Sequence, residues 1–183
     1  MKLKFELQDA LFIGFCATLL VVIKSMLRLK LGLSGHSMFL MTFFYLLCYG
    51  AVGKAGSITA CGLLAGVVAM LLSVGKGGPL ILLKFGLPAV AMDLILLLIS
   101  GAFNLRLQSV IVALVGSFAW ASKGWAENML AGMTSQIALT KFALNFLQGG
   151  VFAVGAALLV PSVLKRLQAH DLFEDHHSKK SKH

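Results

Sequence analysis

The sequence predicts an all-α, polytopic membrane protein with six transmembrane helices and both termini in the cytoplasm. Hydrophobic residues make up 58% of the 183-residue chain and charged residues only 13%, which is unlike the composition of soluble domains. The apolar residues form long runs, and short stretches rich in glycine separate them. Because one span needs about 20 residues, the chain has room for about six spans and for no separate soluble domain.

The first predicted span covers residues 7–23 and continues as an amphipathic extension to residue 29. Its small residues Ala10, Gly14 and Ala17 recur at i, i+4 and i+7, so they lie on one side of a helix. Small residues let two helix backbones approach closely in a membrane. This side therefore packs either within the protein or against a partner, and the sequence favours neither.

The second and third spans cover residues 38–52 and 57–74, and a glycine-containing turn at residues 53–56 joins them. The third span is rich in glycine and alanine. That composition predicts a central, closely packed helix.

The fourth span, residues 80–100, contains Lys84, Pro88 and Asp93. Proline removes one backbone hydrogen bond and kinks a helix. Asp93 lies about 20 Å along the span at 1.5 Å per residue, where an ionisable group indicates a functional site. The alternative is a hydrogen-bonded structural aspartate. Lys84 precedes Asp93 by about 900° of helical rotation, so the two side chains point in different directions.

The fifth span covers residues 107–120 or a little beyond, and the sixth covers residues 133–160, with Pro161 marking its end. Residues 1–164 thus form the transmembrane domain. Residues 165–183 are charged and rich in histidine and lysine, which predicts a disordered tail. Slightly more lysine and arginine falls on the side of the termini, so the positive-inside rule places both in the cytoplasm.

Several functional classes are not predicted. Cys16, Cys48 and Cys61 stand alone in apolar runs, which predicts buried thiols rather than a metal or redox site. The formal charge of +9 is scattered, so no nucleic-acid binding is expected. The segment Gly-Leu-Ser-Gly at residues 32–35 matches the serine motif of rhomboid proteases, but no histidine on a later span could act as its base. We expect neither enzyme activity nor a cofactor.

The most polar internal stretch, residues 120–148, carries two tryptophans, two lysines and a glutamate. In a continuous last helix, Lys141, Asn145 and Gln148 share one face, and a polar face entering a bilayer turns toward protein or water. We predict a basic, aromatic-lined hollow, open to the exterior, that binds a small planar or anionic molecule. Anchoring of the tryptophans and the first lysine at the membrane boundary is the alternative.

Six spans in this length, the small-residue ridge on the first span, a long loop at residues 24–37 and polar residues on spans four to six resemble a known family. The chain looks like a substrate-binding S component of an energy-coupling factor (ECF) transporter. The resemblance implies that Ala10, Gly14 and Ala17 dock on a transmembrane coupling subunit and that separate ATPase subunits drive uptake. The ligand would be a vitamin-like micronutrient, because the N-terminus lacks the histidine of the nickel and cobalt members.

The resemblance also implies a ligand site built from the first loop and the last three spans. Lysines would meet an anionic group, tryptophans would stack on a ring and amides would fix its orientation. The predicted ligand-binding residues are His36, Lys84, Asp93, Trp120, Lys123, Trp125, Glu127, Asn128, Gln136, Lys141 and Asn145.

Two other functions fit the sequence. One is a small proton-coupled carrier or channel in which Asp93 and Lys141 form a switchable pair, and proton-gradient-dependent uptake by this chain alone would support it. The other is a membrane enzyme or assembly factor without a transport role, which product formation in detergent would support.

Overall fold

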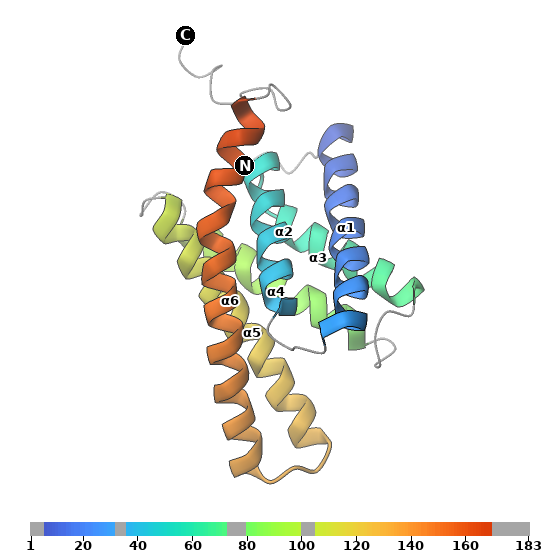
Figure 1. Cartoon of the computed structure of the whole chain (residues 1–183), viewed down its shortest axis with the longest axis vertical. Coiled ribbons are helices and arrows are strands. Elements are labelled where there is room, and N and C mark those ends of the chain that lie inside the picture. The colour runs from blue at the N-terminus through green and yellow to red at the C-terminus, as the bar shows by residue number, and fades with distance from the viewer. Residues whose placement is uncertain (1–5, 32–35, 73–79, 100–104, 170–183) are drawn as a thin grey trace.

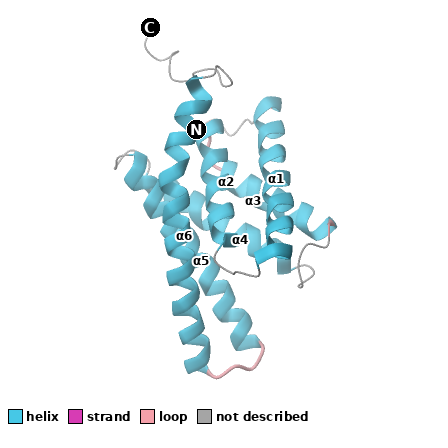
Figure 2. Cartoon of the chain, viewed as in Figure 1, coloured by secondary structure: helices cyan, strands magenta, loops and turns pink. Residues whose placement is uncertain are grey.

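The computed structural model describes residues 6–31, 36–72, 80–99 and 105–169, and these ranges are helical apart from short turns. No strand occurs within them (Figure 2), so the all-α prediction is confirmed. The six helices of Figure 1 are α1 (Leu7–Leu31), α2 (His36–Val52), α3 (Ser57–Leu71), α4 (Leu80–Ile99), α5 (Leu105–Leu130) and α6 (Ser135–Ala169).

Four of these helices, α1, α4, α5 and α6, are long and apolar enough to cross a membrane. Helices α2 and α3 are also apolar but have only 17 and 15 residues. At 1.5 Å per residue they measure about 26 and 23 Å, less than the roughly 30 Å of a hydrocarbon core. The four long helices indicate a membrane protein, while six crossings remain a prediction.

Helix α5 is longer than predicted. It continues well beyond Trp120 because no proline interrupts it and because Lys123 and Glu127 form an ion pair at i, i+4. The turn after its last residue contains Gly132, whose φ of 80° is a left-handed conformation that glycine adopts without a steric cost.

Helix α6 continues through Pro161 to Ala169. The proline removes one backbone hydrogen bond, and a helix that packs along both α2 and α5 tolerates this loss. The predicted start of the tail at residue 165 is therefore wrong, because Lys165 and Arg166 are helical. Residues 170–183, the rest of the predicted tail, lie outside the described residues.

Helices α5 and α6 form an antiparallel hairpin that extends beyond the other four helices at one end of the molecule (Figure 1). The start of α1 and the end of α6 lie at the opposite end. Helix α2 contacts α1, α3, α5 and α6 and contributes the fully buried Met41 and Tyr45 to the core. Helices α4 and α6 both pack against α5, so these three helices meet beside the base of the hairpin.

Pro88 lies inside α4, as predicted, and is fully buried. Proline weakens the backbone hydrogen bonding of the turn before it. The hydroxyl of Tyr45 in α2 donates a hydrogen bond of 2.9 Å to the carbonyl oxygen of Phe85 in that turn. The carbonyl that loses its N–H donor to the proline is that of Lys84, four residues earlier. The neighbouring helix supplies a donor to the next carbonyl in the same turn.

The predicted close packing of the third span is confirmed at Gly62 and Gly66. Both are buried where α3 meets α4. A Cβ atom at Gly62 would collide with the Cβ of Ala89 and lie 3.0 Å from the carbonyl oxygen of Phe85. A Cβ atom at Gly66 would lie 3.2 Å from the Cα of Leu82. The absence of side chains therefore lets the two backbones approach each other.

We expect Gly62→Ala to lower the free energy of unfolding by about 1 to 3 kcal/mol, because the helices must move apart to admit the methyl group. Gly14→Ala is the matched control, since a Cβ atom at Gly14 would have no neighbour within 4 Å. This control should gain up to about 1 kcal/mol from the higher helix propensity of alanine. Thermal unfolding in one detergent measures both variants, and equal midpoints would contradict the close packing.

The fold buries one of the three residues of the predicted docking ridge on α1 and leaves the other two accessible. Ala10 is exposed and Gly14 is half-buried, whereas Ala17 is completely buried in the core. Ala17 packs within the protein, so it is not available to a partner. Only the first two residues of the predicted ridge remain open.

Candidate ligand-binding site

A pocket of about 230 Å³ lies among α4, α5 and α6, beside the base of the hairpin. Six of its seven lining residues are among those predicted from the sequence. The lining residues are Lys84, Trp120, Lys123, Gly124, Glu127, Asn128 and Asn145.

One face of α5 provides most of the pocket wall. Trp120, Lys123, Glu127 and Asn128 follow each other at i, i+3, i+7 and i+8, so their side chains leave the same side of the helix. These polar residues fall within α5 because the helix continues beyond the predicted end of the span. The sequence thus builds a polar wall on one face of this helix.

Helices α4 and α6 complete the pocket with Lys84 and Asn145. Asn145 faces Gly124 of α5, because a Cβ atom at Gly124 would lie 3.9 Å from the amide nitrogen Nδ2 of Asn145. The absence of a side chain at Gly124 leaves the space between the two helices open. Gly124 is the one lining residue that the sequence did not predict, and its position four residues after Trp120 was the signal that could have found it.

The charges of the pocket are partly compensated. Lys123 and Glu127 form an ion pair within α5, in which the lysine side chain is 12% exposed and the glutamate side chain 46% exposed. With Lys84, the wall carries two cations and one anion. The pocket therefore keeps a net positive charge, which attracts an anionic group.

Trp120 provides a flat apolar surface in this polar wall. Its ring lies 3.5 Å from the position that a Cβ atom at Gly149 of α6 would occupy. The side chain of Met38 in α2 lies 3.3 Å from the same position. The indole therefore packs against the α6 backbone, and this packing restricts its orientation. Such a ring can stack on a planar ligand or hold a cation over its face.

The lining groups can hydrogen-bond and bind charge. The seven lining residues include no serine, cysteine or histidine that could serve as a nucleophile with its base. Among the residues that the structure describes, no group of three His, Cys, Asp or Glu side chains could hold a metal ion. The three described cysteines are free and buried, as predicted.

Asp93 of α4 lies outside the pocket, and its carboxylate faces the start of α3. Its carboxylate accepts hydrogen bonds from the backbone N–H of Thr59 at 2.7 Å, the Thr59 hydroxyl at 2.6 Å and the backbone N–H of Gly56 at 3.3 Å. The side chain is only 5% exposed. It therefore caps α3 from a neighbouring helix, which corresponds to the structural alternative rather than to the ligand-binding prediction.

Lys141 is the second predicted residue outside the pocket. It is exposed on α6, and its ammonium group lies 3.5 Å from the sulfur of Met133. The outer part of the hairpin extends past α1 to α4 (Figure 1), so α6 has only α5 beside it there. The predicted Asp93–Lys141 pair is not formed, because the hydrogen bonds of Asp93 go to α3.

Two further predicted residues do not line the pocket. Trp125 and Gln136 are exposed, since they lie on other faces of the hairpin. The backbone of His36 begins α2, and its side chain lies outside the described residues. The structure thus brings together six of the eleven predicted residues.

The structure also shows polar contacts that the sequence did not predict. Asp9 at the start of α1 and Lys54 before α3 form an ion pair. The ammonium of Lys24 lies 4.1 Å from the ring centroid of Phe85, where the sequence predicted only an amphipathic extension. Each pair joins residues distant in the chain, so helical periodicity alone gave no signal for it.

What the pocket can do chemically is hold a small ligand through charge, stacking and amide hydrogen bonds. Comparisons with protein-family models, with curated proteins and with solved structures found no match for this chain.

Proposed function

We propose that this protein is a membrane-embedded binding subunit that holds a small anionic molecule with a planar ring, for uptake of a micronutrient. One observation carries the proposal: the pocket combines the Trp120 ring, the cations of Lys84 and Lys123 and the amides of Asn128 and Asn145. A ring surface, positive charge and orienting amides are the parts that a specific site for such a ligand requires.

The size of the pocket limits the ligand. Its 230 Å³ is below the roughly 300–1,000 Å³ of sites for drug-sized molecules, but larger than an engineered cavity of about 150 Å³ that binds benzene. The space therefore suits one ring with an acidic substituent better than a large cofactor.

The role in uptake rests on the membrane-crossing helices and on the chemistry of the lining. The lining holds charged groups, amides and an aromatic ring, and the role proposed for them is binding rather than turnover. In this proposal an uptake cycle takes its energy from ATPase subunits in other chains, coupled through a transmembrane partner. The open residues Ala10 and Gly14 on α1 offer a surface at which another helix could approach closely.

Mass spectrometry of the protein purified in a mild detergent tests this proposal. We expect one small organic acid to co-purify in a stoichiometric amount and to be released on unfolding. A protein that never retains such a molecule, and that binds none when offered a mixture of cyclic acids, would contradict the proposal.

Lys84→Gln should weaken binding of the co-purified acid about 10- to 100-fold, because a hydrogen bond to a charged group contributes about 1.5 to 3 kcal/mol. Lys141→Gln is the matched control, since it removes the same charge from an exposed position outside the pocket. Titration calorimetry with the purified acid compares the two Kd values. If both variants lost affinity equally, the effect would come from the overall charge rather than from the pocket.

A further inference from the structure

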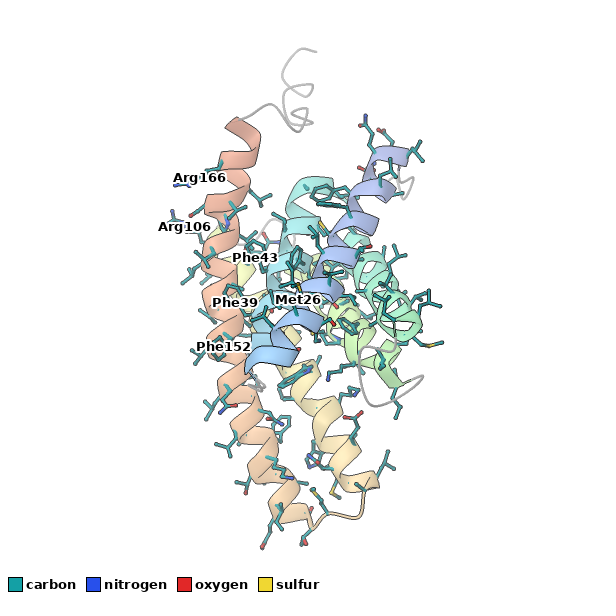
Figure 3. All side chains as sticks on the ribbon, turned by 45° about the vertical axis from the view of Figure 1, so that its right-hand side comes forward. Met26, Phe39, Phe43, Arg106, Phe152 and Arg166 are labelled. Carbon is teal, nitrogen blue, oxygen red and sulfur yellow. The ribbon has the colours of Figure 1, made fainter. Side chains whose placement is uncertain are left out.

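Three basic residues gather at the end of the molecule opposite the hairpin tip. Arg106 lies in the first turn of α5, and Lys165 and Arg166 lie in the last turns of α6. All three are exposed. Figure 3 shows Arg106 and Arg166 near each other on the same side of the molecule, both pointing away from the helices. The antiparallel packing of α5 and α6 brings the start of α5 back toward the later turns of α6, and α6 continues beyond it (Figure 1).

No carboxylate in the described part of the chain balances these charges. Asp9 pairs with Lys54, and Glu127 pairs with Lys123 in the pocket. Asp93 accepts its hydrogen bonds at the start of α3. Glu6 directly precedes α1, and the start of this helix lies on the other side of the molecule from the two labelled arginines (Figure 3). Among the described residues, Arg106 and Arg166 therefore form a basic corner without a paired carboxylate, and an anionic group would complement it.

An apolar strip continues from this corner along α6. Leu159 and Phe152 precede Arg166 by 7 and 14 residues, and they are 50% and 43% exposed. Fourteen residues turn the helix by about 1,400°, within 40° of four full turns, so the three residues lie on one face. They extend over about 21 Å, and Figure 3 shows Phe152 below Arg166 on that side.

We propose that this corner binds the phosphate headgroup of an anionic phospholipid, with an acyl chain lying along the strip of Leu159 and Phe152. Arginine binds phosphate through two parallel hydrogen bonds, and basic pockets at the ends of membrane helices hold anionic headgroups. The apolar strip favours a lipid over a soluble phosphate, because a free phosphate has no group to place there. The inference rests on the membrane-crossing helices and is independent of the ligand pocket.

Native mass spectrometry of the delipidated protein tests the proposal with phosphatidylglycerol and phosphatidylcholine of the same acyl chains. Wild-type protein should retain phosphatidylglycerol preferentially. Each of Arg106→Gln and Arg166→Gln should reduce this preference about 5-fold and the double variant about 25-fold, since one basic residue contributes about 1 kcal/mol near anionic lipid. Lys141→Gln, which removes one charge from the other end of α6, should leave it unchanged.

The unfolding midpoints of all variants in phosphatidylcholine verify that they fold, and exposed positions should leave the midpoints as in wild type. Retention of phosphatidylglycerol by the double variant at the wild-type level would overturn the proposal. Equal loss in Lys141→Gln would also overturn it, because it would show general attraction rather than a site. Displacement of the lipid by glycerol phosphate at equal concentration would overturn the choice of a lipid.

Discussion

Replacing Asp93 by alanine is expected to lower the free energy of unfolding by about 3 to 5 kcal/mol. The variant loses three hydrogen bonds at once, two from backbone N–H groups at the start of α3 and one from the Thr59 hydroxyl. The first N–H groups of a helix have no partner within it. Because the site is almost completely buried, water cannot replace the carboxylate without a rearrangement.

Two further substitutions separate the contribution of the accepted hydrogen bonds from that of the negative charge. Asp93→Asn removes the charge and keeps one acceptor oxygen for Thr59, but its NH2 group cannot accept the weaker bond from Gly56 at 3.3 Å, so it should cost about 1 to 2 kcal/mol. Thr59→Val removes the hydroxyl but keeps the backbone N–H, and should cost about 1 kcal/mol. Thermal or denaturant unfolding in detergent measures all three variants. A midpoint for Asp93→Ala equal to wild type would contradict the cap.

The same variants decide between a structural aspartate and the proton-coupled carrier. A carrier that depends on protonation of Asp93 would lose gradient-driven uptake in Asp93→Asn while remaining folded. If Asp93 only caps α3, Asp93→Asn should lose uptake only to the extent that the protein unfolds. The absence of a pair between Asp93 and Lys141 favours the cap.

The helical pattern was predictable because local residues determine it. Glycine-containing turns separate the apolar runs, and the predicted starts of the spans near residues 7, 57 and 80 agree with the structure. Proline was the misleading signal. Pro161 does not end α6, because a long helix with packing on either side of the proline can lose one hydrogen bond.

The sequence predicted the pocket residues that share one face of a single helix. The spacing of Trp120, Lys123 and Glu127 along α5 places them together whatever the rest of the chain does. Lys141 was predicted on the same principle and lies outside, because periodicity fixes a face but not which helix covers it. Asp93 shows the second limit: its partners Gly56 and Thr59 come from another helix, and nothing in the sequence near Asp93 identifies them.

Gly124→Phe is expected to abolish ligand binding, with a loss of affinity of about 100-fold or more, because its side chain would occupy the space in which a ring must sit. Gly124 lines the pocket where α5 faces Asn145. The substitution leaves both lysines, the glutamate and both amides in place. A loss of binding would therefore result from the filled volume rather than from changed charge.

Gly124→Ala is the control for this test. A Cβ atom there would meet only the amide nitrogen of Asn145, at 3.9 Å, so the methyl group fits without displacing a neighbour. This variant should bind within about threefold of wild type and should gain up to about 1 kcal/mol of stability from helix propensity. The amount of small acid that co-purifies per mole of protein compares wild type with both variants. If Gly124→Phe folded and retained the acid at the wild-type ratio, the ligand would lie elsewhere and the pocket among α4, α5 and α6 would not be its site.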